Sequence, residues 1–480
     1  MRRPLLLAAL PISLATLLGC SRSVLPLEPG ADVEPAGAEP PAAKCEQGDW
    51  ARALAASVGP LATGIAVDRG CNVLVVGSFI ETVDLGDGPL VSAGGADIFV
   101  AKLTTDGETV WSRRFGGAED EQAVKVAASP DGGVIFTGHV DGAIDFGGGP
   151  LEDVGRGAFL AKLDGDGVYV FSRRFGTATY QSVEPVRITG LAVGPDGEAA
   201  LKGYFDGTVD FGGGPVESAG LDDIFVAKYD RTGAHVFDRR FGDAEYQNDS
   251  GGIAIDGQGN VVFVGDFQGT IDFGDGPIQS AGDHDLLLAK LDPRGDTVWA
   301  RTFGGKGAEQ AGPIAVDSRG RIAIAGNFEG TVDFGGGPMT STQGYHFNLF
   351  VAGVDRDGQH RWSKRFGDVD GEEAIGLGYD VLDRLMLVGN FAGTLVFGGK
   401  GLNTEGGWDV FAVRFGAEGD PAESRRFGDK ESQRCEGIAV DPLGHVLMTG
   451  SFSGQVDFGG GALQGTPGDA DAFVARLPIF

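Results

Sequence analysis

The chain has 480 residues, of which 84 are glycine, and a formal net charge of −30. Nucleic-acid binding depends on Lys and Arg side chains that neutralise phosphates, so this acidic balance disfavours a nucleic-acid partner. It equally disfavours peripheral docking on anionic lipid. Hydrophobic residues make up 42% of the chain, which excludes wholesale disorder.

The N-terminus has the features of a secretion signal. Arg2 and Arg3 precede an apolar stretch at 5–18 that is too short to span a bilayer. This stretch ends in Leu17-Leu18-Gly19-Cys20 and resembles a bacterial lipoprotein signal with its lipobox. The resemblance implies cleavage before Cys20 and a lipid, including palmitate, on that cysteine. The alternative is an ordinary secretory signal with an incidental cysteine.

Three segments follow from this interpretation. Residues 1–19 are a signal peptide, residues 20–45 are a lipid-anchored tether rich in Pro, Ala and Glu, and residues 46–480 are the folded part. The residue after the cysteine is Ser21 and not Asp. By resemblance to enterobacterial sorting, this favours the outer membrane of a bacterial cell envelope.

A Gly-rich phrase recurs in the rest of the chain at spacings of 61 to 65 residues. A period this long in an all-β pattern indicates a repeat architecture, because one unit cannot bury its own faces. Six of the seven copies carry an aspartate, and Val396 takes its place in the remaining copy, at 394–398. The copies are TVDLG at 82–86, AIDFG at 143–147, TVDFG at 208–212, TIDFG at 270–274, TVDFG at 331–335, TLVFG at 394–398 and QVDFG at 455–459.

Each unit also contains four strand-like phrases, typified by GIAVD at 252–256, NVVFVGDF at 260–267, DIFVAKL at 97–103 and WSRRFG at 111–116. The third phrase is apolar at nearly every position, so both of its faces should be buried, as in a radial blade that lies between two neighbours. The fourth carries paired arginines, which suit an outer edge strand. We therefore expect this order from axis to rim.

The two ends of the repeat region complement each other. Residues 48–54 match the fourth phrase without a preceding third one, and residues 471–477 match the third phrase without a following fourth. Pairing the two completes one blade and protects two sheet edges. The sequence predicts an all-β fold: a seven-bladed β-propeller with four-stranded blades, closed by strand 48–54 on strand 471–477.

The region 46–480 resembles the SBBP-type β-propeller repeat of bacterial envelope proteins. The likeness rests on IAVDxxGNVxVxG, GTVDFGGG and DIFVAKLDxxG, which recur along this region. The resemblance implies a propeller and little about activity.

No catalytic residue, cofactor or metal ligand is expected. A carboxylate repeated in six units indicates structure, since a reaction site needs one special place. The histidines are not paired at ligand spacing, and no G-x-S-x-G motif is present. Calcium is the alternative at two acidic segments, 164–167 and Asp368–Glu373.

The features that break the repeat are better functional candidates. Loops from the fourth phrase to the next first phrase should line one mouth of the central channel, and the loop at 341–348 should open on the same face. We expect a recognition face there that is acidic and contains a few aromatic residues. The alternative is that these loops are only solvated surface. Its candidate residues are Glu119, Asp120, Glu121, Tyr180, Glu245, Tyr345, His346, Asp368, Asp370, Glu372, Glu373, Asp429 and Glu431.

Three cysteines remain after lipidation. Strand direction places Cys45 and Cys71 on the opposite face near the closing blade, and Cys435 on the mouth side. If a disulfide forms, we expect it between Cys45 and Cys71.

These observations favour a monomeric, lipid-anchored envelope protein that binds or scaffolds through its acidic face, with an envelope protein or glycan as partner. The alternative is an envelope carbohydrate-active enzyme, a lyase or a hydrolase, that uses channel carboxylates. A cluster of carboxyl groups with raised pKa in one pocket would favour the enzyme.

Overall fold

The computed structural model describes residues 45, 48–152, 155–176, 185–247, 250–342, 347–367, 371–466 and 469–477, with the backbone alone for 55–61. The expected signal peptide, Cys20 and most of the tether lie outside these residues. Within the described ranges every regular element is a strand, and no helix is long and apolar enough to cross a membrane.

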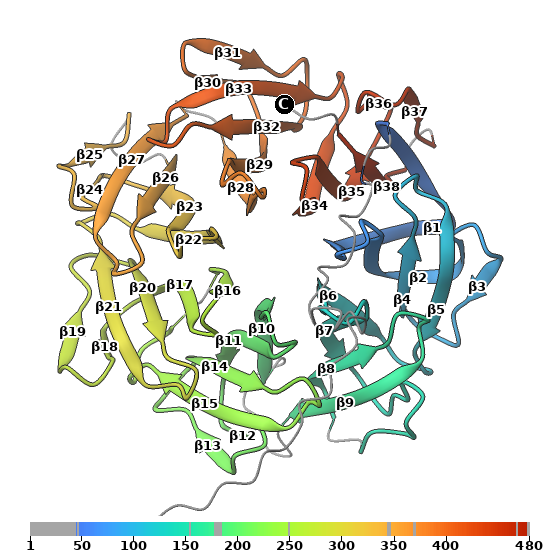
Figure 1. Ribbon diagram of the computed structural model, residues 1–480, viewed down its shortest axis with the longest axis horizontal. Coiled ribbons are helices and arrows are strands. Elements are labelled where there is room, and N and C mark those ends of the chain that lie inside the picture. The colour runs from blue at the N-terminus through green and yellow to red at the C-terminus, as the bar shows by residue number, and fades with distance from the viewer. Residues whose placement is uncertain are drawn as a thin grey trace, which may run out of the picture. The chain divides into compact units, whose positions relative to one another are not determined.

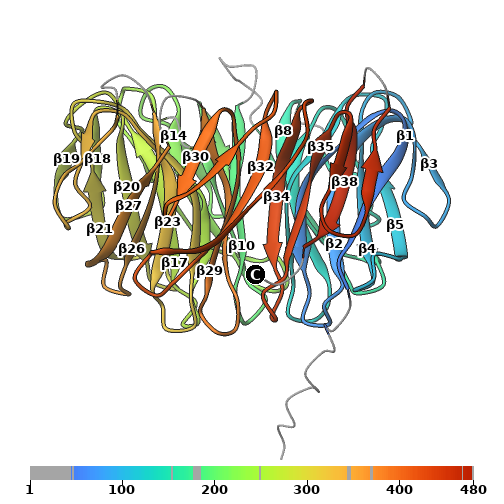
Figure 2. The ribbon, with the colours of Figure 1, turned by 90° about the horizontal axis from the view of Figure 1, so that it is seen from above.

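Residues 43–480 form one compact unit in which seven blades surround a central channel (Figure 1). The four strands of each blade are antiparallel and follow one another from the axis to the rim in chain order, apart from the closing blade, which takes its outermost strand from the start of the chain. The predicted seven-bladed propeller and its strand order are thus confirmed. Figure 2 shows the ring from the side, with the strands running between its two faces.

Within each blade the strands run from the innermost to the outermost in the following order. Blade 1 contains β1 (Trp50–Val67), β2 (Val73–Asp84), β4 (Asp97–Leu103) and β5 (Thr109–Phe115); blade 2 contains β6 (Glu121–Ala128), β7 (Val134–Val140), β8 (Gly157–Leu163) and β9 (Tyr169–Gly176). Blade 3 contains β10 (Val186–Val193), β11 (Ala199–Phe205), β14 (Asp223–Tyr229) and β15 (His235–Phe241); blade 4 contains β16 (Ile253–Ile255), β17 (Val261–Phe267), β20 (Asp285–Leu291) and β21 (Thr297–Phe303). Blade 5 contains β22 (Glu309–Val316), β23 (Ile322–Phe328), β26 (Asn348–Val354) and β27 (His360–Phe366); blade 6 contains β28 (Glu372–Tyr379), β29 (Leu385–Phe391), β32 (Asp409–Phe415) and β33 (Pro421–Phe427). Blade 7 contains β34 (Gln433–Val440), β35 (Val446–Phe452), β38 (Asp471–Arg476) and the first part of β1.

Burial explains why the third strand of each blade is so apolar. All seven residues of β4, β8, β14, β20 and β26 are buried, because each blade packs its two faces against its neighbours. The innermost and outermost strands contain both buried and partly exposed residues. The hydrophobic core is therefore a series of layers between blades, as in the cluster around Phe136, Phe146 and Phe159.

The repeated Gly-rich phrase forms a short ribbon outside most blades. In blade 3 the Oδ1 of Asp210 accepts hydrogen bonds from Gly212 N at 2.7 Å and Gly214 N at 3.0 Å. Both glycines have φ of +112°, a conformation that favours glycine. The repeated aspartate is thus a turn residue, as expected. The ribbon strands are β3 (Pro89–Val91) on β2, β12 (Thr208–Asp210) with β13 (Pro215–Glu217), β18 (Thr270–Asp272) with β19 (Pro277–Gln279), β24 (Thr331–Val332) with β25 (Met339–Thr340), β30 (Thr394–Phe397) with β31 (Lys400–Asn403), and β36 (Gln455–Asp457) with β37 (Ala462–Gln464).

The ring closes through the two ends of the repeat region, as predicted. β1 pairs antiparallel with β38, from Trp50 opposite Arg476 to Leu54 opposite Ala472. The Trp50 indole donates a hydrogen bond to the Thr105 carbonyl at 2.8 Å. Trp111 makes the same contact with the next blade, at Gly165 O and 3.0 Å. The closing junction therefore repeats the contacts of an ordinary junction.

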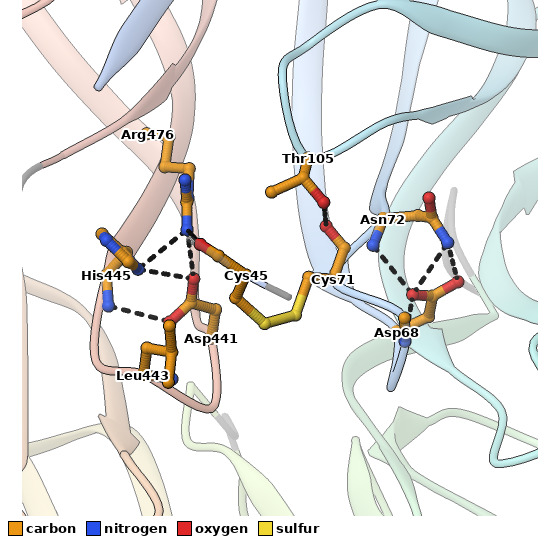
Figure 3. The surroundings of a disulfide bond; sticks show 10 residues. Cys45, Asp68, Cys71, Asn72, Thr105, Asp441, Leu443, His445 and Arg476 are labelled. Carbon is orange, nitrogen blue, oxygen red and sulfur yellow. Dashed lines mark hydrogen bonds and ion pairs between the residues drawn. A yellow bond between two sulfur atoms is a disulfide. The ribbon is translucent and has the colours of Figure 1, made fainter. Parts of the chain in front are cut away.

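A disulfide and an arginine fasten the closure (Figure 3). Cys45 is bonded to Cys71, with their Cα atoms 5.7 Å apart, which is the pairing expected from strand direction. The Nη2 of Arg476 donates to the Cys45 carbonyl at 2.6 Å and to Asp441 Oδ2 at 2.9 Å. Arg476 is 1% exposed, so this contact ties the start of the described chain to the last strand.

The two faces of the ring differ in their connections. We call the face where the chain passes from one blade to the next the mouth face, and the face with the tight turns inside blades the turn face. Cys71 lies in the turn between the first two strands of blade 1, so the disulfide is on the turn face. The free thiol of Cys435 is buried near the start of β34, towards the mouth face.

Carboxyl groups gather where blades meet on the mouth face. In three blades the aspartate that begins the third strand accepts a hydrogen bond from the second arginine of the outermost strand: Asp97 from Arg114, Asp223 from Arg240 and Asp409 from Arg426. Blade 4 carries Thr302 at that arginine position, opposite Leu287 in the ladder.

Glu309, the first residue of the next blade, is 0% exposed beside Asp285. Burial first, and the charge of Asp285 second, raise the pKa of Glu309 to about 8.

Candidate functional site

A ring of polar side chains surrounds the channel near the mouth face. Each lies on the second strand of a blade: it is the next-to-last residue in six blades and lies within the longer β2 in blade 1. We call these seven residues the polar belt: Ser78, His139, Tyr204, Asp266, Asn327, Asn390 and Ser451.

The polar belt joins neighbouring blades through their backbones. Asn390 Oδ1 accepts from Cys435 N at 2.8 Å, and its Nδ2 donates to Cys435 O at 3.1 Å. Asn327 Nδ2 donates to the carbonyl of Glu372 at 2.8 Å. In each case the partner is 45 residues further along the chain. These side chains satisfy backbone groups on the innermost strands that have no sheet partner on the channel side.

The belt borders a cavity of about 610 Å³ at the mouth of the channel, over blades 3 to 6. Its walls come from the first residues of β10, β22 and β28, which stand around the channel in Figure 1, and from the chain just before β16 and β22. Ala308, Ala311, Gly312, Gly326, Ala374 and Ile375 form its apolar part. The polar side chains that line it are Arg187, Thr189, Tyr204, Ser250, Asp266, His284, Gln310, Asn327 and Glu373.

Asp266 is the one carboxylate of the belt and is 5% exposed. Its Oδ1 accepts from Ser250 Oγ at 2.6 Å and from Ala311 N at 3.3 Å. Burial raises the pKa of Asp266 above its ordinary value, and these hydrogen bonds offset part of the rise. Ser250 also contacts the Ala311 carbonyl at 2.8 Å, so the pair holds β22 in place as well as lining the cavity.

Two further contacts shape the cavity wall. Arg187 Nη1 donates to the Tyr204 hydroxyl at 3.1 Å. On the other side, Glu373 Oε2 lies 2.6 Å from Arg434 Nη2, and that guanidinium lies 4.5 Å from the ring centre of Trp408. With Arg434 beside it, the described wall of this cavity is therefore close to balanced in charge.

The channel also contains a second cavity of about 320 Å³, lined by the innermost strands, which we call the throat. Its wall combines glycines, such as Gly64, Gly190 and Gly437, with aliphatic side chains, and Lys125 occupies the corresponding glycine position in blade 2. Burial lowers the pKa of Lys125, and the charge of Glu436 acts in the opposite direction. Burial also disfavours the charged form of Glu436, and therefore raises the pKa of this carboxyl group.

The candidate residues from the sequence fall into different surroundings. Glu373 lines the cavity. Glu121 and Glu372 are buried at blade junctions, with 0% and 4% exposure, and therefore lie inside the ring and not on its surface. Glu119, Asp120 and Glu245 are exposed on loops at the junctions. Tyr180, Tyr345, His346, Asp368 and Asp370 lie outside the described residues.

Asp429 and Glu431 line a separate groove of about 640 Å³ beside the ribbon of blade 7. The Oδ1 of Asp429 accepts from Glu431 N at 2.8 Å, and its Oδ2 accepts from Gln455 N at 2.9 Å. Burial tends to raise the pKa of Asp429, but these hydrogen bonds leave it lowered. Asp429 thus holds its own loop against the ribbon.

Sequence reasoning missed most of the cavity. A signal was present in the sequence. The polar-belt position holds Ser, His, Tyr, Asp or Asn in different blades, whereas the residues around it repeat. Among the described residues no group of three or more His, Cys, Asp or Glu is arranged to hold a metal ion. Residues 368–370, part of the segment for which calcium was the alternative, lie outside that search.

Two curated proteins share weak sequence similarity with the chain. The regulatory protein FlaEY of Caulobacter vibrioides is 27% identical over 203 residues, which are 40% of this chain and 21% of that protein. An uncharacterized WD repeat-containing protein of Acanthamoeba polyphaga mimivirus is 25% identical over 154 residues, which are 29% of this chain and 11% of that protein. The chain thus spans about a fifth or less of the length of these relatives. No family model matches the sequence.

Several solved structures resemble the fold at low identity. Virginiamycin B lyase from Staphylococcus aureus aligns with 90% of this chain and 99% of its own, at 11% identity and a TM-score of 0.41. Sqt1 from Chaetomium thermophilum aligns with 90% of this chain and all of its own, at 10% identity and a TM-score of 0.42. A protein of unknown function from Dyadobacter fermentans covers 74% of this chain and 93% of its own, at 13% identity and a TM-score of 0.39. We draw no functional conclusion from these likenesses.

Proposed function

We propose that this chain is a lipid-anchored protein of the bacterial envelope, of the SBBP-repeat type, that binds a ligand at the mouth of its propeller channel. The observation that carries the proposal is the cavity over blades 3 to 6, where side chains that differ from blade to blade meet in a volume of about 610 Å³. Small-molecule sites in proteins typically enclose about 300–1,000 Å³ and combine apolar walls with a few placed polar groups.

Enzymatic use of channel carboxylates, as a lyase or hydrolase, has less support. Glu121 and Glu309, whose pKa values are raised to about 7 and about 8, are buried at blade junctions and not in the cavity. Among the described residues, the cavity holds one carboxyl with a raised pKa, Asp266, and the throat holds another, Glu436. Binding without turnover therefore accounts better for the arrangement.

The test is a cavity-filling substitution, Ala308→Tyr, in the full chain purified in mild detergent. A panel of neutral saccharides, uronates, amino sugars, amino acids and dipeptides is screened by shifts in the unfolding temperature. We expect at least one class to stabilise the wild type and to lose its effect in Ala308→Tyr, because the new ring occupies the cavity.

Ala422→Tyr is the control, since Ala422 is exposed on the outermost strand β33, away from the channel. It should respond as the wild type does. If no compound stabilises the wild type, or if both variants respond equally, the cavity is not a binding site and the proposed function is wrong.

A further inference from the structure

We infer that the mouth cavity takes a neutral, hydroxyl-rich ligand, of which a short neutral saccharide is the simplest example. This inference rests on the proposed function and names the ligand class of that same cavity. Three properties of its wall carry the argument: charge balance, the type of hydrogen-bonding group, and the small apolar surface between those groups.

The first property is the charge balance of the wall. The chain as a whole carries −30, yet the cavity wall sets one cation, Arg187, against two acids, Asp266 and Glu373. Arg434, beside the wall, lies 2.6 Å from Glu373 and offsets the charge of that acid. Arg187 faces the Tyr204 hydroxyl, and Asp266 is held by Ser250 and a backbone N–H. A charged ligand would lose its water shell on entering this site. The wall has no excess of the opposite charge to offset that free-energy cost.

The second property is that much of the polar wall can both donate and accept hydrogen bonds. Thr189, Tyr204 and Ser250 carry hydroxyl groups, and Gln310 and Asn327 carry amides. Asn327 uses Nδ2 on the Glu372 carbonyl, and Gln310 is exposed at the cavity wall on β22. A ligand hydroxyl also donates and accepts, so it can satisfy such groups in either direction. A purely anionic or cationic group cannot do so.

The third property is the surface between the polar groups. Ala308, Ala311, Gly312, Gly326 and Ala374 are small, so the wall is flat and close to the backbone there. Such a surface can cover the C–H face of a sugar ring, which is apolar, while the ring hydroxyls reach the amides and hydroxyls at its edge. The volume of about 610 Å³ lies within the roughly 300–1,000 Å³ range of small-molecule sites.

The test uses saturation-transfer NMR and isothermal titration on the full chain in mild detergent. The neutral probes are trehalose, maltose and cellobiose, and the charged probes are digalacturonate and glucosamine. We expect binding of at least one neutral disaccharide and weaker binding of both charged probes. Gln310→Ala should weaken the neutral probe by roughly 3–10-fold, as the loss of one hydrogen bond to a neutral group does.

Gln122→Ala is the matched control. Gln122 occupies the same position in β6 as Gln310 does in β22. Gln122 lies opposite the belt residue His139, and Gln310 lies opposite the belt residue Asn327. It lies outside the cavity wall, so its loss should leave the affinity unchanged. Tyr204→Phe, which removes a cavity hydroxyl and keeps the ring, should weaken binding as Gln310→Ala does.

The inference is overturned if a charged probe binds more tightly than every neutral one, if no neutral probe binds, or if neutral binding survives both Gln310→Ala and Tyr204→Phe unchanged. These failures remain distinct from a failure of the proposed function. If dipeptides or uronates bind and Ala308→Tyr removes their binding, the cavity is a binding site for another ligand class. If nothing in the broader panel binds, the proposed function and this inference fall together.

Discussion

At the residue scale, the first residue of the innermost strand differs in its chemistry from one blade to another. Glu309 and Glu121 begin the innermost strands of their blades, and glutamine takes that place as Gln433 in blade 7. Gln433 Nε2 donates to the Ser453 carbonyl at 2.9 Å, a bond that an ionised glutamate cannot make. Glu309 is fully buried, and burial and the charge of Asp285 outweigh the hydrogen bond from the Gly305 backbone, which acts in the opposite direction on its pKa. Glu309 is thus held most easily in its protonated form.

This predicts that stability falls as the pH rises. The pKa of Glu309 is raised from 4.5 to about 8, so the folded state binds a proton that the unfolded state releases above pH 4.5. Its contribution is complete below pH 4.5 and is lost as the pH approaches 8, with a slope of up to about 1.4 kcal/mol per pH unit. Glu309→Gln should make the unfolding free energy less dependent on pH between 5 and 8 and raise it at pH 8, measured by urea unfolding.

Glu217→Gln is the control, because Glu217 is exposed on β13 of an outer ribbon. It should leave the pH profile of the wild type in place. An equal slope in wild type and Glu309→Gln would show that Glu309 does not hold a proton in the folded ring.

At the element scale, ring closure rests on one strand and one covalent bond. The first part of β1 covers the edge of β38, which is otherwise an apolar strand with unpaired backbone groups. Cys45 and Arg476 add a disulfide and a buried hydrogen bond at the same junction. The strand pairing was predictable because the phrases at 48–54 and 471–477 complement each other. The role of Arg476 was not, since the lysine at this position in blade 4, Lys290, pairs with Asp256 of its own blade at 2.8 Å and gives no sign of a contact with Cys45.

Two variants separate the strand from the disulfide. Deleting residues 48–54 should lower the unfolding temperature by well over 10 °C and cause self-association, because an exposed β38 edge can pair with another chain. The double variant Cys45→Ser/Cys71→Ser keeps the strand and should lose about 3 kcal/mol, the usual effect of opening a loop of this length. Calorimetry and size-exclusion chromatography measure both.

A deletion that unfolds at the wild-type temperature would contradict closure by β1. If the double serine variant unfolds at as low a temperature as the deletion, the disulfide and not the strand closes the ring.

At the scale of the whole molecule, the chain is a ring whose two faces differ in structure. The turn face carries the disulfide and the tight turns, and the mouth face carries the cavity and the loops between blades. Irregular residues gather at the mouth because loops there do not have to satisfy the sheet packing that fixes the strands.

The proposed anchoring gives a prediction for the whole chain. Cys20→Ser should move the protein from the membrane fraction to the soluble fraction and abolish labelling with radioactive palmitate, because the lipobox cysteine is the only lipid acceptor we propose. Ser23→Ala, three residues further along, is the control and should leave both properties intact. A Cys20→Ser variant that stays labelled in the membrane fraction would rule out the anchor.

The number of blades, the order of the strands and the closure of the ring can be predicted from the sequence. These follow from periodicity and apolar patterning, which every blade must obey to pack against its neighbours. Which polar residues meet is fixed by the folded ring. Tyr204, Asp266, Asn327 and Glu373 lie in four different blades, and their meeting depends on the radius of the ring and the depth of each strand in it. The acidic loops stood out in the sequence, yet Glu121 and Glu372 are buried between blades. The variable belt position marks single residues in the sequence, but which of them share a cavity had to be found in the folded ring.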